Sequence, residues 1–145
     1  MLLRDERQMA VSAVETLCLE TADHYAAAAR RTDDAGLAQL FDTLAQQRRQ
    51  LAAELAAQIR ALDDLPQQPD PDREAVEEVF SGIKAFLSGD ARAVLVGERE
   101  RAEEDLAAAA SAALRHAQGP QMHDVLRRIL AHAEAAMREL AAVRP

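Results

Sequence analysis

The sequence predicts an all-α protein of one domain, an antiparallel four-helix bundle with a short extra helix between the second and third long helices. Strong helix formers, above all Ala, Leu, Glu, Arg and Gln, dominate the 145 residues, which include only five Gly and five Pro. Apolar residues recur at helical spacing in four long stretches. Short segments rich in turn-forming residues separate those stretches. A chain of this length fits one core, so residues 1–145 are expected to form a single bundle.

The first two long helices are expected at about 2–31 and 34–63. Thr32, Asp33 and Asp34 together supply the turn between them and the N-cap chemistry of the second helix. The stripe of the first helix follows Ala10, Ala13, Val14, Leu17, Thr21, His24 and Ala28. That of the second follows Leu37, Leu40, Phe41, Leu44, Leu51, Leu55, Ile59 and Leu62.

A shorter helix is expected at about 71–87. The segment 64–71 contains three prolines and cannot continue the second helix. Asp70 as N-cap and Pro71 at the first helical position then begin the short helix. Its apolar face follows Val76, Val79, Phe80, Ile83 and Phe86.

The last two long helices are expected at about 90–116 and 120–143. Ser88, Gly89 and Asp90 separate the third from the short helix, and Gly119-Pro120 makes a sharp stop and restart. The stripe of the third follows Ala91, Leu95, Ala102, Leu106, Ala109 and Ala113. That of the fourth follows Met122, Leu126, Ile129, Ala133, Met137 and Leu140.

The lengths of the connections predict how the helices are arranged. Short loops make the first two long helices one antiparallel hairpin and the last two another. The join between the hairpins is longer, and a helix of about 17 residues alone covers roughly 25 Å. This reach permits the long crossover of ferritin-like bundles, and a simple up-down bundle with a folded-back join stays open as the alternative.

The net charge and the cysteine content limit the binding partners and the cellular compartment that are expected. With a formal net charge of −8 the chain has no basic face for nucleic acid, and it is repelled by anionic membrane surfaces. The single cysteine excludes an intramolecular disulfide, and charges interrupt the apolar stretch that a signal peptide would need. We therefore expect a cytoplasmic protein that binds neither nucleic acid nor membrane.

Two arginines interrupt the apolar stripes and are expected to be polar residues of the core. Arg48 stands between Leu44 and Leu51 in the second helix, and Arg99 lies in the stripe of the third long helix. Folding each hairpin brings Arg48 to the level of Glu20, and Glu103 is near mid-height as well. A buried Arg48 paired with Glu20 or with Glu103 would fix the register of the helices.

The same level of the bundle offers a second, chemical interpretation. Bundles build metal sites from carboxylates and histidines that project into the core. The candidate ligands are Glu20, His24, Glu103 and His132, with Glu134 as a further one. No Glu-x-x-His is present, and Arg48 would put a fixed positive charge where a cation should sit. The metal is undefined, with iron or another divalent ion as the candidates, and no catalytic residue is assigned.

Two further residues at the border of the first stripe are assigned to packing. Cys18 has no base beside it that would make it a nucleophile, so it is expected to be a small buried apolar residue. Tyr25 is likewise expected to serve packing rather than redox chemistry.

Several short segments are similar to those of a bacterial family. They are Tyr25 with Ala28-Ala29, Arg48 with Glu54-Leu55, Glu103-Glu104, Ala113-Leu114, and Arg138 with Leu140. On these positions the chain resembles, from about residue 15 to 140, small bacterial ferritin-like proteins related in fold to rubrerythrins, whose domain has no defined function. Departures stand at Thr21, His24, Ala110 and Glu134, so the resemblance implies the fold and only a stress-associated or metal-related role.

Two functional hypotheses follow. The first is a ferritin-like bundle that is non-enzymatic or keeps a degenerate metal site, and that acts through oligomerisation, as a homodimer or larger, or through a protein partner. The alternative is a metal-binding or di-iron oxidase-like stress protein that uses carboxylates and histidines in the bundle core. Converging carboxylates would favour the second.

Overall fold

The computed structural model describes residues 2–62, 89–117 and 119–144, and this part of the chain is entirely helical apart from turns. The helices are α1 (Leu2–Arg31), α2 (Ala35–Ala61), α4 (Gly89–His116) and α5 (Pro120–Val143). All four long helices are therefore confirmed, with bounds within two residues of those predicted. The short helix expected at about 71–87 lies outside the described residues.

Local sequence explains where α2 and α5 begin. The Asp34 side chain accepts a hydrogen bond from the Leu37 N–H at 3.0 Å, which satisfies one of the free donors at the start of α2. Gly119 has a φ of 86°, a left-handed conformation that favours glycine, and Pro120 follows at the first helical position of α5. Both signals were readable in the sequence.

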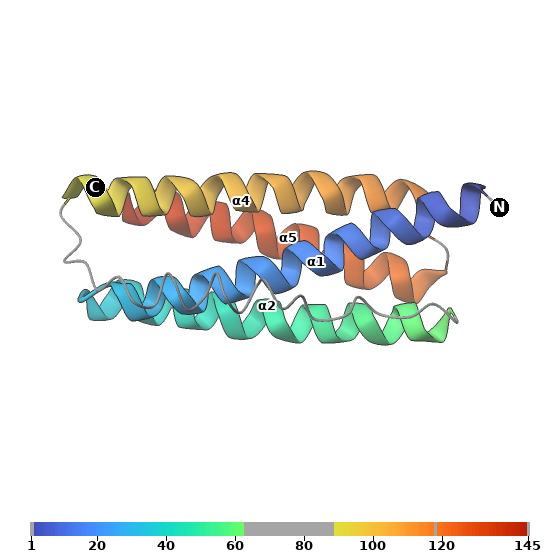
Figure 1. The fold of residues 1–145 in the computed structure, drawn as a ribbon, viewed down its shortest axis with the longest axis horizontal. Coiled ribbons are helices and arrows are strands. Elements are labelled where there is room, and N and C mark those ends of the chain that lie inside the picture. The colour runs from blue at the N-terminus through green and yellow to red at the C-terminus, as the bar shows by residue number, and fades with distance from the viewer. Residues whose placement is uncertain (1, 63–88, 118, 145) are drawn as a thin grey trace.

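Each helix packs against two neighbours. The packed pairs are α1 with α2, α4 with α5, α1 with α4, and α2 with α5, so α1 lies diagonally from α5 and α2 from α4. All neighbouring helices run in opposite directions, whereas α2 and α4 run in the same direction (Figure 1). Consequently α4 begins at the end of the bundle opposite to the end of α2, as a long crossover requires and a simple up-down path does not.

Apolar side chains form two core clusters, one toward each end of the bundle. The first includes Val14, Leu55 and Leu106, and the second includes Phe41 and Leu140. Alanines are frequent in both clusters, which lets the helix backbones approach closely. Where the two clusters meet, all four helices contribute polar side chains to the interior of the bundle.

The faces of α1 and α4 differ from those predicted. Tyr25 and Cys18, placed at the border of the first stripe, are fully buried, whereas His24, placed within it, is only half-buried. Glu103, which is not part of the predicted stripe of its helix, is also fully buried. Apolar and small residues surround much of α1, so the spacing alone did not define which of them faces the other helices. Packing against α2 and α4 decides it.

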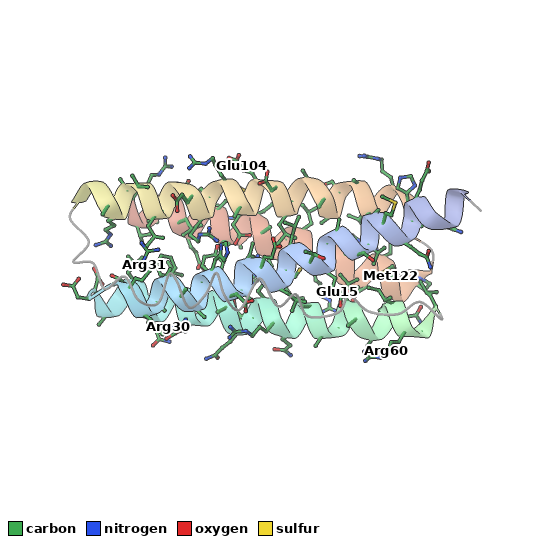
Figure 2. All side chains as sticks on the ribbon, viewed as in Figure 1. Glu15, Arg30, Arg31, Arg60, Glu104 and Met122 are labelled. Carbon is green, nitrogen blue, oxygen red and sulfur yellow. The ribbon has the colours of Figure 1, made fainter. Side chains whose placement is uncertain are left out.

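The solvent-facing sides of the helices carry the expected charges. Arg30, Arg60 and Glu104 point away from the bundle (Figure 2). Of the described helices, none combines the length and the apolar character that crossing a membrane would need.

Candidate functional site

The polar level between the two core clusters receives side chains from all four helices. They are Thr21 and Tyr25 from α1, Arg48 from α2, Glu103 from α4 and His132 from α5, and we call these five residues the polar layer. All are buried except His132, which is half-buried. The layer is the largest concentration of buried polar side chains in the described part of the chain.

Arg48 is the centre of the polar layer. Its Nη2 donates to both carboxylate oxygens of Glu103, at 2.8 Å to Oε1 and 3.0 Å to Oε2. Neither side chain has any exposed surface, so the ion pair is fully buried. Because α2 and α4 are diagonal in the bundle, the pair passes through the middle of the core. It connects two helices whose backbones do not touch.

Thr21 holds the other end of the guanidinium group. Its hydroxyl accepts a hydrogen bond from Arg48 Nη1 at 2.8 Å and donates to the carbonyl of Leu17 at 2.7 Å. A hydroxyl that uses its proton on its own helix presents its lone pairs to the arginine. Thr21 is thereby fixed as an acceptor.

Tyr25 completes the coordination of the carboxylate. Its hydroxyl donates a hydrogen bond to Glu103 Oε2. The ring stacks on Phe41 with centroids 5.8 Å apart, and the Arg48 guanidinium lies over it at 6.0 Å. Burial first, and then the Glu103 charge, raise the pKa of Tyr25 far above its usual range. The phenol is therefore a permanent donor.

His132 links the layer to the surface of the bundle. Arg48 Nε donates to His132 Nδ1 at 3.1 Å, and His132 Nε2 lies 2.9 Å from Gln47 Oε1. Arginine can only donate, so Nδ1 is unprotonated and Nε2 carries the proton that is given to Gln47. Burial, followed by repulsion from Arg48, lowers the pKa of His132 to about 4. The imidazole is consequently neutral.

Cys18 lies next to this layer but contributes no reactive group. It is a free thiol with no exposed surface. Burial raises its pKa to about 12, and the nearby Arg48 charge only partly opposes that shift. With the thiolate form suppressed, Cys18 is a small apolar residue of the core.

The second interrupting arginine lies one helical turn from the carboxylate. Arg99 is four residues before Glu103 on α4, and its side chain is 8% exposed. Its Nη1 is buried without a hydrogen-bond partner among the described residues. Burial lowers the pKa of Arg99. Both arginines expected in the core are therefore buried. All three side-chain nitrogens of Arg48 donate hydrogen bonds, whereas Nη1 of Arg99 has no acceptor among the described residues.

The structure brings some of the sequence-derived candidates together and separates others. Glu103 and His132 both contact Arg48, and of the two pairings considered for Arg48 the structure has Glu103 rather than Glu20. Glu20 is half-buried, and Glu134 is exposed. His24 is also half-buried and lines a small cavity beside Arg99.

The donor set was tested against a metal ion. No three of the described His, Cys, Asp and Glu side chains lie close enough together to hold one. The two candidates that do converge, Glu103 and His132, are held apart by the guanidinium group, which already supplies the positive charge. As they lie in this structure, the described candidate ligands do not fit a metal ion.

Sequence reasoning missed three members of the hydrogen-bond network. Thr21 was assigned to the apolar stripe, Tyr25 to packing, and Gln47 was given no role. One signal could have found the first two: Thr21 and Tyr25 are spaced i and i+4, so both face the same neighbour on α2. That neighbour is Arg48, the only charged residue in the predicted stripe of α2.

Removing the Arg48 side chain should strongly destabilise the fold. Arg48→Ala leaves the Glu103 carboxylate buried without its cation, and we expect it to destabilise the fold by roughly 3–5 kcal/mol. Urea unfolding followed by circular dichroism measures this. Arg49→Ala is the matched control, because Arg49 is adjacent and half-exposed and should change stability by less than roughly 0.5 kcal/mol. Near-neutral stability of Arg48→Ala would contradict the buried pairing.

Because the His132 imidazole is neutral in the folded protein, we expect the stability of the fold to depend on pH. The folded protein keeps His132 neutral down to a pKa of about 4, whereas the unfolded chain protonates it near the ordinary value of 6.5. The unfolded state therefore takes up the proton first, so this residue makes stability fall as the pH is lowered from 6.5 toward 4. Above that window its contribution is constant.

His132→Asn keeps an acceptor near the position of Nδ1 and removes the titration. We expect urea unfolding between pH 4 and 7 to show a smaller loss of stability for this variant than for wild type. His116→Asn, at an exposed position, should behave as wild type. An NMR titration midpoint for His132 near 6.5 would contradict the lowered pKa of this residue.

Comparison of the chain with protein-family models, with curated proteins and with solved structures found no match.

Proposed function

We propose that this protein is a non-enzymatic, ferritin-like helical bundle in which the Arg48 guanidinium takes the position of a metal ion, and that it acts by binding a protein partner, in the first instance a second copy of itself. One observation carries the proposal. Arg48 uses Nε, Nη1 and Nη2 on acceptors from α5, α1 and α4, so a fixed organic cation sits where inward-facing ligands converge.

The path of the chain supports the ferritin-like part of the proposal. Ferritin-like bundles have one long crossover, and their metal ligands project inward from all four helices. Here α2 and α4 run in parallel on a diagonal, and the polar layer draws on every described helix. The agreement is one of geometry, since the ligand set of a metal centre is incomplete.

The reactive groups of the polar layer are already hydrogen-bonded or protonated, which supports the non-enzymatic part of the proposal. Both oxygens of Glu103 accept hydrogen bonds, and Tyr25 and Cys18 are held protonated by burial. A group that is to act as a nucleophile, base or ligand needs a free lone pair and access to a substrate. The one half-buried member, His132, has both ring nitrogens engaged.

With no reactive group in the layer, the surface of the bundle is where we place its function. Among the described residues, three large apolar side chains are exposed: Met9 on α1, Leu62 after α2 and Val94 on α4. Met9 is near the start of α1 and Leu62 follows α2, at one end of the bundle, whereas Val94 is near the start of α4 at the other end (Figure 1). The proposed contact is therefore between helices rich in alanine rather than at one large apolar patch. A two-fold dimer is the commonest form of such an assembly.

Metal content tests the central claim. Protein purified without chelator or affinity tag should contain no stoichiometric metal by mass spectrometry, and anaerobic Fe(II) titration followed by air should show no oxidation. In Arg48→Ala the space left by the guanidinium faces Glu103 and His132, so Zn²⁺ should raise the unfolding temperature of this variant and not that of wild type. Adding Glu103→Gln to Arg48→Ala should abolish the Zn²⁺ effect.

Arg49→Ala is again the matched control and should not respond to Zn²⁺. Stoichiometric iron in wild type that is lost in Glu20→Ala and Glu103→Ala would contradict the proposal. That result would establish the metal-binding or di-iron oxidase-like alternative instead.

The mode of action makes a separate prediction. Sedimentation equilibrium of the wild-type protein at micromolar concentration should give about twice the mass of one chain, as a two-fold dimer does. Val94→Lys should shift the equilibrium toward monomer if α4 lies in the contact, with Arg101→Lys as a charge-conserving control on the same helix. A monomer at all concentrations would rule out self-association and leave a different protein as the partner.

A further inference from the structure

The outer face of α5 carries charged side chains on both sides of an exposed alanine. The helix buries one face against α2 and α4, and the opposite face is exposed. Residues spaced three and four apart share one face of a helix. On the exposed face of α5 these residues are Asp124, Arg127, Ala131, Glu134 and Arg138. Ala131 is at the middle of the helix, which runs from Pro120 to Val143.

The charges of this face have opposite signs before and after Ala131. Arg127 is four residues before Ala131, and Glu134 is three residues after it. Asp124 is seven residues before Ala131, and Arg138 is seven residues after it. Positions seven residues apart lie within about 20° of one another around a helix, so Arg127 is in line with Glu134 along α5. The face is therefore complementary to a reversed copy of itself.

A two-fold axis beside Ala131 would bring the opposite charges together. In an antiparallel pair of helices, the positions before Ala131 on one copy face the positions after it on the other. Arg127 then faces Glu134 of the second copy. Asp124 in the same way faces Arg138 of the second copy, and the symmetry forms each pair twice. The small side chain of Ala131 allows the two helices to approach closely at the axis.

The charged side chains of this face are available for such a contact. Arg127, Glu134 and Arg138 are exposed, and none of them has an ion pair with another described residue. Asp124 is 66% exposed and accepts a hydrogen bond from Arg128 Nε on one oxygen, Oδ2, at 2.9 Å. Its second carboxylate oxygen is left for a partner.

The outer face of α4 does not have this complementarity. Its exposed charges in the middle of the helix are Glu98, Arg101, Glu104 and Asp105. Three of the four are acidic, so two copies of α4 would bring like charges together, which disfavours a contact. Among these two helices, α5 is therefore the one whose exposed charges fit a second copy.

We propose that the outer face of α5, formed by Asp124, Arg127, Ala131, Glu134 and Arg138, is the surface on which a second copy of this chain docks in antiparallel orientation. The inference rests on the proposed function, because it names the face through which self-association takes place. Exposed ion pairs are individually weak, so these four charges set the orientation and the choice of partner more than the affinity.

Reversal of one charge tests the pairing of Arg127 with Glu134. Arg127→Glu and Glu134→Arg each turn an attractive pair into a repulsive one, twice in every dimer. In sedimentation equilibrium at low ionic strength, each variant alone should raise the dissociation constant of the dimer roughly ten- to hundredfold. Both positions are exposed, so the circular dichroism of each variant should match wild type.

A mixture of the two variants is the decisive measurement. In a dimer of one Arg127→Glu chain and one Glu134→Arg chain, both pairs again join opposite charges. Mixing equal amounts should therefore restore dimers with about the wild-type dissociation constant, and loss of the fold in either variant could not produce this rescue. Arg101→Glu, the same charge reversal on the outer face of α4, is the matched control and should dimerise as wild type does.

The outcomes separate this surface from the proposed function. A wild-type chain that is monomeric at all concentrations would overturn self-association, and this surface with it. A wild-type dimer that neither charge reversal weakens would overturn the α5 surface alone, as would two weakened variants that do not form dimers on mixing. In both of those cases the chain associates through another face.

Discussion

The ion pair between Arg48 and Glu103 joins α2 to α4, two helices that lie on a diagonal of the bundle and make no backbone contact. Both side chains are fully buried, so each needs the other, and the pair forms only when α2 and α4 are at one level along the bundle. Thr21 and His132 fix α1 and α5 to the same guanidinium. Alanine-rich helices offer few large side chains that would oppose sliding, and we infer that the polar layer sets their register.

Such a layer is not the most stabilising way to fill a core. Removing two charges from water costs several kcal/mol per ion, and well-packed apolar residues often replace a buried pair at no loss of stability. The layer limits this cost because its hydrogen bonds are mutually dependent. Arg48 needs the neutral form of His132, and the Tyr25 hydroxyl shares the Glu103 charge. What the layer adds is one permitted alignment of four similar helices, a matter of specificity rather than of total stability.

The fold was predictable where the sequence carries local signals. Asp34 and Gly119-Pro120 defined helix starts to within a residue or two, because capping depends on neighbours in the chain. Arg48 was identifiable because it is the one charge in a regular apolar stripe. The partner of Arg48 was harder to predict, because Glu20 and Glu103 both lie at its level along the bundle. In addition, α4 carries Glu98, Arg99 and Glu103 within six residues. Small rotations of the helices decide among them, and only packing fixes those rotations.

The same packing determines which residue types meet at the polar layer. Four inward-facing positions at one level are a property of the helix arrangement, but the residue types at those positions determine what they bind. A di-iron centre of a ferritin-like bundle needs several carboxylates, and the metal ions relieve their mutual repulsion. Here a single carboxylate meets a guanidinium that is part of the chain, so the positive charge is present whenever the protein is folded. The Arg48 guanidinium therefore occupies this site as soon as the protein folds, and its occupancy cannot respond to the supply of a free metal ion.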